Sequence, residues 1–319
     1  MDFEPRAPSP EPLSAQFPDY PFNSNFLSVN GRRMHYLDEG DKNAPPVVMV
    51  HGNPTWSFFY RKPVAVLRDR YRCIVPDHIG MGLSEKPGPS GYGYLLQNRI
   101  DDLESLLGQL EIREKITLLV HDWGGMIGMA YACRYPERIA GLIILNTAAF
   151  LIPRGARFPW QLGLARGPFG PFLIKGCNAF SKAAVRLCVS RVLSPQIRHA
   201  YLAPYDSWNN RHAVLRFVQD IPLQPGDPSY ELVKRVDEGI ITFKNTPMLI
   251  CWGMKDFVFT NTFLEQWRNR FPEAEIHAFA DAGHFVLEDA AEDVIPIIRK
   301  FLNEAPLNTN ESNRVSREA

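Results

Sequence analysis

Residues 118–126 read Leu-Leu-Val-His-Asp-Trp-Gly-Gly-Met, an order that could hold a reactive carboxylate at a sharp corner of the chain. The apolar run favours a strand and the residues from Met126 onward favour a helix, so Asp122 is predicted to lie at the turn between them. A carboxylate there can attack carbon and form an ester with the enzyme. The start of the helix would keep it ionised, and a water-poor cavity would keep it nucleophilic. The alternative is that Asp122 only caps the helix.

His284 and Asp256 are the candidate partners of this nucleophile. Hydrolases with a nucleophile at a strand-to-helix elbow carry, in chain order, the nucleophile, an acid and a histidine. His284 follows the last predicted strand, and Asp256 follows an earlier one and would orient the imidazole. The other place for the acid holds Asn146, which cannot carry the negative charge. The alternatives are a turn aspartate at Asp256 and a hydrogen-bonded loop histidine at His284.

Asn53 and Trp123 could donate hydrogen bonds to a leaving anion. The indole N–H of Trp123 donates but cannot accept or ionise, and Asn53 offers an amide from the loop after a predicted strand. The backbone N–H groups of both residues could also form an oxyanion hole. For Trp123 the alternative is a purely packing role.

The reactive residues need a sheet that brings distant strand ends together. Short apolar segments alternate with helical spacing, and the predicted parallel strands cover residues 47–50, 73–75, 116–120, 139–145, 247–252 and 275–279. Such alternation predicts a mostly parallel, doubly wound α/β sheet, whose sites lie at the carboxyl ends of the strands. All the acidic, amide and histidine candidates follow such ends.

Changes in composition divide the chain into five parts. The expected parts are a Pro-rich extended leader over 1–25, a first core segment over 26–150, an inserted helical cap over 151–240, a second core segment over 241–304 and a disordered tail over 305–319. The cap is inferred because the alternation stops at Phe150 and residues rich in aromatics, Pro and Gly follow. A cap over the sheet edge could supply the water-poor cavity.

The bulk composition is that of an ordinary globular protein, with 45% hydrophobic and 22% charged residues. Lys and Arg together number 35, as do Asp and Glu, so no basic field suggests nucleic acid as a partner. The five cysteines form no CxxC pair, which predicts buried reduced thiols and no zinc site. Neither a secretory signal nor an apolar run of the roughly 18–20 residues that span a membrane is evident, so a cytoplasmic protein is expected.

Three motifs resemble the haloalkane dehalogenase branch of the α/β-hydrolases. They are His-Gly-Asn-Pro-Thr-Trp at 51–56, Val-His-Asp-Trp-Gly-Gly at 120–125 and Gly-Met-Lys-Asp at 253–256, and the resemblance covers nearly all of 26–303. It implies an α/β-hydrolase fold with a helical cap. It also implies roles for the nucleophile Asp122, the base His284, the acid Asp256, and the halide-binding pair Asn53 and Trp123. The implied reaction releases halide and alcohol through an alkyl ester that His-activated water hydrolyses, with no cofactor or metal.

The segment 76–84 most resembles the third dehalogenase subfamily, which is similar to the β-lactone decarboxylases of bacterial olefin synthesis. The same residues could act on a β-lactone and release carbon dioxide and a long-chain alkene. The substrate is therefore expected to be a small apolar haloalkane or β-lactone, and a homo-oligomer or enzyme assembly is left open. Two further alternatives are an epoxide hydrolase using Tyr201, Tyr205 or Tyr230 and a hydrolase-fold receptor without turnover.

Overall fold

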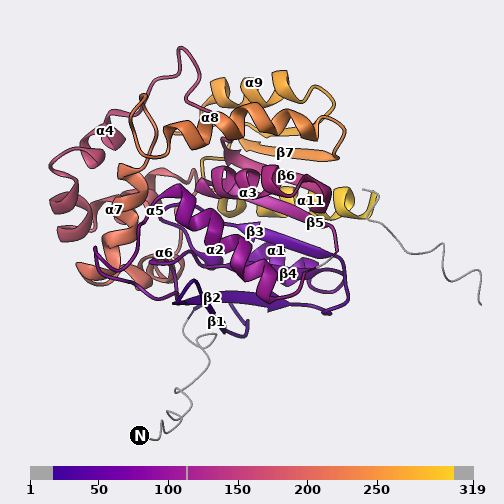
Figure 1. Cartoon of the computed structure of the whole chain (residues 1–319), viewed down its shortest axis with the longest axis horizontal. Coiled ribbons are helices and arrows are strands. Elements are labelled where there is room, and N and C mark those ends of the chain that lie inside the picture. Colours follow the sequence, from indigo (N-terminus) through magenta and orange to yellow (C-terminus); the bar gives the residue numbers. More distant parts are fainter. Residues whose placement is uncertain (1–16, 113, 305–319) are drawn as a thin grey trace, which may run out of the picture.

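The computed structural model describes residues 17–112 and 114–304, which form one sheet covered by helices (Figure 1). The eight strands lie in the order β1-β2-β4-β3-β5-β6-β7-β8. β1 and β2 pair antiparallel with each other, β2 pairs antiparallel with β4, and the remaining neighbours are parallel. The strands are β1 (Asn25–Val29), β2 (Arg32–Glu39), β3 (Pro46–Val50), β4 (Arg72–Pro76), β5 (Ile116–Asp122), β6 (Ile139–Thr147), β7 (Met248–Gly253) and β8 (Glu275–Phe279). The predicted mostly parallel sheet is confirmed.

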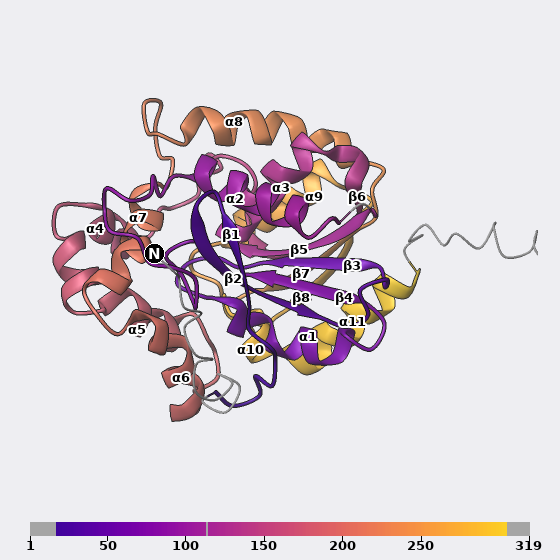
Figure 2. The same cartoon turned by 60° about the horizontal axis from the view of Figure 1, so that its bottom comes forward.

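The central strands are apolar on both sides because helices cover both faces of the sheet. In β3, Val48 and Val50 pack in one core cluster, whereas Val47 and Met49 pack in another. The first cluster includes side chains of α2 (Leu96–Gln109), α3 (Trp123–Arg134), α8 (Tyr230–Gly239) and α9 (Asn261–Arg270). The second includes side chains of η2 (Ser57–Tyr60), α1 (Arg61–Leu67), α10 (Val286–Asp289) and α11 (Ala291–Glu304). Figure 2 shows these two groups of helices on opposite sides of the sheet.

The chain between β6 and β7 leaves the sheet and forms a separate group of helices. They are α4 (Trp160–Arg166), η4 (Pro171–Gly176), α5 (Ala179–Leu187), α6 (Pro195–Leu202), η5 (Ala203–Tyr205), η6 (Asn209–Arg211) and α7 (His212–Gln219), and are called the cap helices below. Figures 1 and 2 both show them to one side of the sheet, with α4 at the outer edge. The next helix, α8, packs against α3 on a sheet face, and η7 (Ile240–Phe243) leads into β7.

Part of the predicted Pro-rich leader is described and packs against the protein. Phe17 and Tyr20 are buried beside Trp56, and the Tyr20 hydroxyl is 2.7 Å from Oγ of Ser57. Residues 1–16 of the leader and the predicted tail over 305–319 lie outside the described residues. Within the described residues, no helix is long and apolar enough to cross a membrane.

All five cysteines are free thiols, as the scattered spacing predicts. Cys73, Cys188 and Cys251 are buried, but Cys133 is only half-buried and Cys177 is exposed. The expectation of uniformly buried thiols was therefore wrong for these two. Spacing along the sequence does not reveal which side of a helix or loop faces the solvent.

Candidate active site

Asp122 lies at the last position of β5, immediately before α3, in a conformation that few residues adopt. Its φ is +52° and its ψ is −128°, which places a residue with a side chain in the left-handed half of backbone space. The corner is tight enough that a Cβ on Gly124 would lie 1.8 Å from the carbonyl oxygen of Val50. A Cβ on Gly125 would likewise collide with the side chain of Thr147 in β6, so the two glycines are explained by contact of the start of α3 with the strands on either side, β3 and β6.

The two carboxylate oxygens of Asp122 have different surroundings. Oδ1 accepts a hydrogen bond from the backbone N–H of Asn53 at 2.6 Å. Oδ2 lies 3.7 Å from Nε2 of His284. Burial raises the pKa of Asp122, and although the charge of His284 and backbone N–H groups of Asn53 and Trp123 lower it, the net shift is upward. Oδ1 is therefore held by the backbone, whereas Oδ2 faces the imidazole ring.

His284 is oriented by Asp256, as the order of residues along the chain predicted. Nδ1 of the imidazole is 2.7 Å from Oδ2 of Asp256. Oδ1 of Asp256 accepts the backbone N–H groups of Val258 and Phe259 at 2.7 and 3.1 Å. Burial lowers the pKa of His284, but the charge and hydrogen bond of Asp256, together with the charge of Asp122, outweigh burial and raise it overall. The ring is therefore held with Nε2 toward Asp122.

Asn146 has a position that sequence reasoning considered only as a place for the acid. Its Nδ2 donates to Oδ2 of Asp256 at 3.0 Å and to the carbonyl of Gly253 at 3.0 Å. Its Oδ1 accepts the N–H of Gly253 at 2.8 Å. Asn146 thus joins β6 to the loop that carries Asp256. An amide in the alternative acid position was the available signal for this role.

His121 is a second neighbour that the sequence did not single out. Its ring lies 4.5 Å from that of His284 between centroids, and its Nε2 lies 2.9 Å from the His284 carbonyl oxygen. Burial lowers the pKa of His121 well below its ordinary range. The neutral ring therefore donates from Nε2 to that carbonyl. This hydrogen bond from the neutral His121 ring helps to fix the loop that carries His284 without adding a charge to the site.

The side chains of Asn53 and Trp123 both line the cavity beside Asp122, but their N–H groups have different surroundings. Nδ2 of Asn53 donates to the carbonyl oxygen of Val214 in α7, at 3.2 Å, so this amide is engaged by a cap helix. The indole of Trp123 lies beside the ring of Phe217, with 5.4 Å between centroids, and lines a cavity. One of the two N–H groups of the Asn53 side chain is thus directed to protein, and the backbone N–H of Asn53 faces Asp122.

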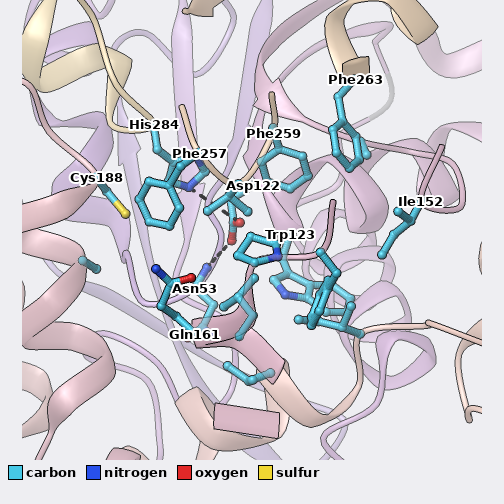
Figure 3. Close-up of a pocket in the computed structure, with 18 of the residues that line it drawn as sticks. Asn53, Asp122, Trp123, Ile152, Gln161, Cys188, Phe257, Phe259, Phe263 and His284 are labelled. Atoms are coloured by element: carbon cyan, nitrogen blue, oxygen red, sulfur yellow. Dashed lines mark hydrogen bonds and ion pairs between the residues drawn. The ribbon is translucent and has the colours of Figure 1, made fainter. Parts of the chain in front are cut away.

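An apolar cavity of about 200 Å³ opens in front of Asp122, between the sheet edge and the cap helices (Figure 3). Side chains from both layers line it, including Phe150, Phe259, Phe263, Phe158, Leu162, Phe180 and Leu187. Asp122, His284, Arg157 and the thiol of Cys188 are the charged or titratable residues in the lining. Such surroundings suit an apolar substrate and leave the carboxylate poorly hydrated. No group of three or more metal-ligating side chains occurs within the described part of the chain.

The fold and this arrangement agree with comparison against known proteins. Residues 45–291 match the α/β hydrolase fold family, and the chain belongs to that family. Two relatives are named cis-3-alkyl-4-alkyloxetan-2-one decarboxylase. The protein from Shewanella oneidensis is 54% identical, over 92% of each chain, and that from Xanthomonas campestris is 47% identical, over 91% of this chain and 99% of the relative. Haloalkane dehalogenase 2 of Mycobacterium tuberculosis is 32% identical, over 88% of this chain and 96% of the relative.

Solved structures of haloalkane dehalogenases share the fold. An ancestral haloalkane dehalogenase superposes with a TM-score of 0.79 at 24% identity, covering 88% of this chain and 99% of the other. A haloalkane dehalogenase from Bradyrhizobium elkani gives a TM-score of 0.77 at 25% identity, with the same coverage. The resemblance to the dehalogenases inferred from the three motifs and the similarity to β-lactone decarboxylases inferred from segment 76–84 are both confirmed.

Proposed function

We propose that the protein is a decarboxylase of cis-3-alkyl-4-alkyloxetan-2-ones, which are β-lactones, and that it forms an alkene and carbon dioxide. The observation that carries the proposal is the 54% identity to such a decarboxylase over 92% of both chains, against 32% to a dehalogenase. The sequence motifs alone favoured dehalogenation and kept decarboxylation as the alternative. The difference in identity reverses that preference, because both reactions would use the same side chains.

The first step is attack by Oδ2 of Asp122 on C4 of the lactone ring. An electron pair of the carboxylate forms the new C4–O bond, and the bond between C4 and the ring oxygen breaks. The ring oxygen keeps that electron pair, so the lactone opens to a carboxylate and Asp122 becomes an alkyl ester. The N–H of Asn53, 2.6 Å from Oδ1, would hold the ester carbonyl while Oδ2 reacts.

The second step returns Asp122 to its starting state. The electrons of the bond between C3 and the carboxylate carbon form the C3–C4 double bond, and those of the C4–O bond return to Asp122. Carbon dioxide and the alkene leave, and neither water nor a proton is consumed. The negative charge thereby passes from the substrate carboxylate, which is poorly solvated in the apolar cavity, to Asp122, whose Oδ1 accepts the N–H of Asn53. Inversion at C4 followed by anti elimination converts a cis lactone into a cis alkene.

We assign His284 to charge stabilisation in this reaction. Its raised pKa favours the imidazolium, and its Nε2 lies 3.7 Å from Oδ2 of Asp122. The positive ring would stabilise the carboxylate released from the lactone, and Asp256 would hold the ring in place through the 2.7 Å bond to Nδ1. Trp123 would pack against the substrate beside the nucleophile.

Dehalogenation is the second candidate, and the paired carboxylate and imidazole favour it. Esterification of Asp122 would remove a charge that raises the pKa of His284, which would help the ring to lose its proton and activate water. A leaving halide would need donors in the cavity; one N–H of the Asn53 side-chain amide donates to Val214, which leaves its second N–H and the indole N–H of Trp123 for this role.

Epoxide hydrolysis has less support. Tyr201 donates its hydroxyl hydrogen bond to Glu288, and Tyr205 donates to the carbonyl of Thr55. Neither tyrosine lines the cavity, and neither does Tyr230. The hydroxyl groups that would activate an epoxide oxygen are thus directed elsewhere. A receptor without turnover would be indicated by stoichiometric binding with no product.

The test compares a long-chain cis-β-lactone with 1-bromohexane on the same purified protein. We expect cis alkene and carbon dioxide from the lactone, detected by gas chromatography, and little bromide from the bromoalkane. Asp122→Asn should abolish alkene formation, whereas Lys300→Gln, an exposed change on α11, should leave it unchanged. Bromide release without alkene would refute the proposal in favour of dehalogenation, and a trans alkene would refute the two-step stereochemistry.

A further inference from the structure

Charge is unevenly distributed along this chain, although the totals balance. The whole sequence has 35 basic and 35 acidic residues, yet residues 151–211 hold nine Lys and Arg and a single acidic residue, Asp206. This segment runs through α4, η4, α5, α6, η5 and η6, which are cap helices. The rest of the chain is correspondingly acidic. The cap therefore carries a positive field that the overall composition conceals.

Most of this positive charge is not neutralised by neighbouring carboxylates. Arg166 pairs with Asp227 at 2.7 Å. Five other cations of the segment are exposed and form no ion pair with any residue that the structure describes. They are Arg154, Arg157, Lys182, Arg186 and Arg191. Such cations are free to contact an anionic surface outside the protein.

The same segment holds most of the large hydrophobic side chains that are exposed in the described residues. Seven of the ten large hydrophobic side chains that are exposed in the described residues belong to 151–211; the other three are Leu223, Ile241 and Phe257. Trp160 is 72% exposed, Phe172 65% and Trp208 50%. Phe172 and Trp208 lie side by side, since both rings are 3.6 Å from the Cβ position of Gly176.

This apolar surface continues into the cavity in front of Asp122. Leu187, 59% exposed, and Phe257, 38% exposed, both also line the cavity. In the sequence, Trp160 lies between Pro159 and Gln161, which both line the cavity. Exposed apolar side chains and one exposed, unpaired cation, Arg157, therefore belong to the lining of the cavity itself.

We propose that this outer surface of the cap binds peripherally to a bilayer containing anionic phospholipids. Aromatic and aliphatic side chains would enter the headgroup region while Arg and Lys contact the phosphates, as in interfacial membrane-binding segments. Charge complementarity selects an anionic surface, and the exposed Trp and Phe side chains select a bilayer over nucleic acid or a purely acidic protein. The benefit of docking rests on the proposed function: a dialkyl lactone dissolved in the bilayer would reach Asp122 without crossing water.

Flotation of the full chain with vesicles tests the docking without any turnover. We expect binding to phosphatidylglycerol vesicles at low salt, at least about tenfold tighter than to phosphatidylcholine vesicles, and weaker binding as salt rises. The double variant Arg186→Glu/Arg191→Glu should bind phosphatidylglycerol at least about tenfold more weakly. The matched control is Arg70→Glu/Lys300→Glu, which makes the same charge change at exposed positions outside the cap and should bind like the parent.

A second pair of variants tests the apolar part of the surface. Trp160→Ser/Phe172→Ser should reduce the binding that remains at high salt, and circular dichroism would establish that each variant is folded. Equal binding to the two lipids, or equal losses in the cap and control variants, would overturn the proposal. Capture by nucleic acid or an acidic protein with no vesicle binding would overturn it too. Alkene formation from a short-chain lactone without vesicles is measured separately, so flotation without any alkene would refute the proposed function and leave the docking intact.

Discussion

Arg61 and Glu288 form a buried ion pair that offers a quantitative test of the contact between cap and core. The two side chains are 1% and 3% exposed, and their atoms meet at 2.5 Å (Nη1 to Oε1) and 3.0 Å (Nη2 to Oε2). Tyr201 of α6 donates to the same carboxylate, and Glu288 lies four residues after His284. The pair thus joins α1, a cap helix and the segment that follows the active-site histidine.

Replacing Arg61 with Met should destabilise the protein because Glu288 would stay buried without its bidentate partner. Breaking one side of a buried pair costs about 3–5 kcal/mol. We expect about 3 kcal/mol, the lower end, because Nζ of Lys62 remains 3.2 Å from Oε2 of Glu288 and can take over part of the charge. The measurement is the free energy of unfolding from urea titration at pH 7, followed by tryptophan fluorescence.

The pKa of Glu288 determines how the stability loss in Arg61→Met should change with pH. Burial raises the pKa of Glu288, but Arg61 and then Lys62 outweigh it, so the pKa lies below its ordinary value. A lowered pKa contributes stability above the unfolded pKa, and that stability is lost as the pH falls through the folded value. In Arg61→Met the burial effect dominates, so the variant's deficit should shrink between pH 7 and pH 5 as Glu288 takes up a proton.

The double variant Arg61→Met/Glu288→Leu separates lost charge pairing from lost packing. Because apolar replacement of a whole buried pair is often neutral, we expect the double variant to recover to within about 1 kcal/mol of the parent. A single variant that loses less than about 1 kcal/mol, or a double variant less stable than the single, would refute the reasoning. A deficit that grows toward pH 5 would refute it as well.

Three further predictions concern the site. Alkene formation should decline at acid pH as Asp122 is protonated, and its midpoint should lie above that of an ordinary aspartate because the pKa of Asp122 is raised. Bromoalkane turnover should in addition fall as the pH drops through the raised pKa of His284. Identical pH profiles for the two reactions would contradict the assigned roles. Asn146→Ala should lower the free energy of unfolding by about 2–4 kcal/mol, because both backbone groups of Gly253 lose a buried hydrogen-bond partner. The same variant should have a lower kcat, and an unchanged urea unfolding curve would contradict this prediction. Trp123→Phe should reduce alkene formation far less than it reduces bromide release, since a halide uses the indole N–H whereas the lactone needs only packing; equal losses would count against this role.

The mostly parallel α/β sheet could be predicted from the order of the apolar segments along the chain. Covering helices on both faces require strands such as 47–50 to be continuously apolar, and the alternation with helical spacing leaves few topologies besides a parallel, doubly wound sheet. The corner at Asp122 was also predictable from a short segment, because Gly124 and Gly125 allow the start of α3 to lie against the neighbouring strands β3 and β6. Chain order then pointed to Asp256 and His284, which the structure brings within 2.7 Å of each other.

Other features depend on which distant groups meet, and no local pattern encodes that. The Asn53 amide donates to Val214, 161 residues away, and Asn146 reaches Asp256 across 110 residues. The directions of these side chains depend on how the cap helices and β7 pack against the rest of the core. The sequence alone could identify donors but not their acceptors.

By itself, the sequence determined that an aspartate occupies the corner of an α/β sheet and that a histidine and a second aspartate can meet it there. Those results follow from periodicity, glycine spacing and chain order, which are properties of short segments. The tertiary structure alone decided that Oδ1 of Asp122 is held by the backbone and that the exposed side chains of Arg157, Leu187 and Phe257 line the cavity. The physical reason is that burial and hydrogen-bond partners arise only when segments far apart in the chain exclude water from one another.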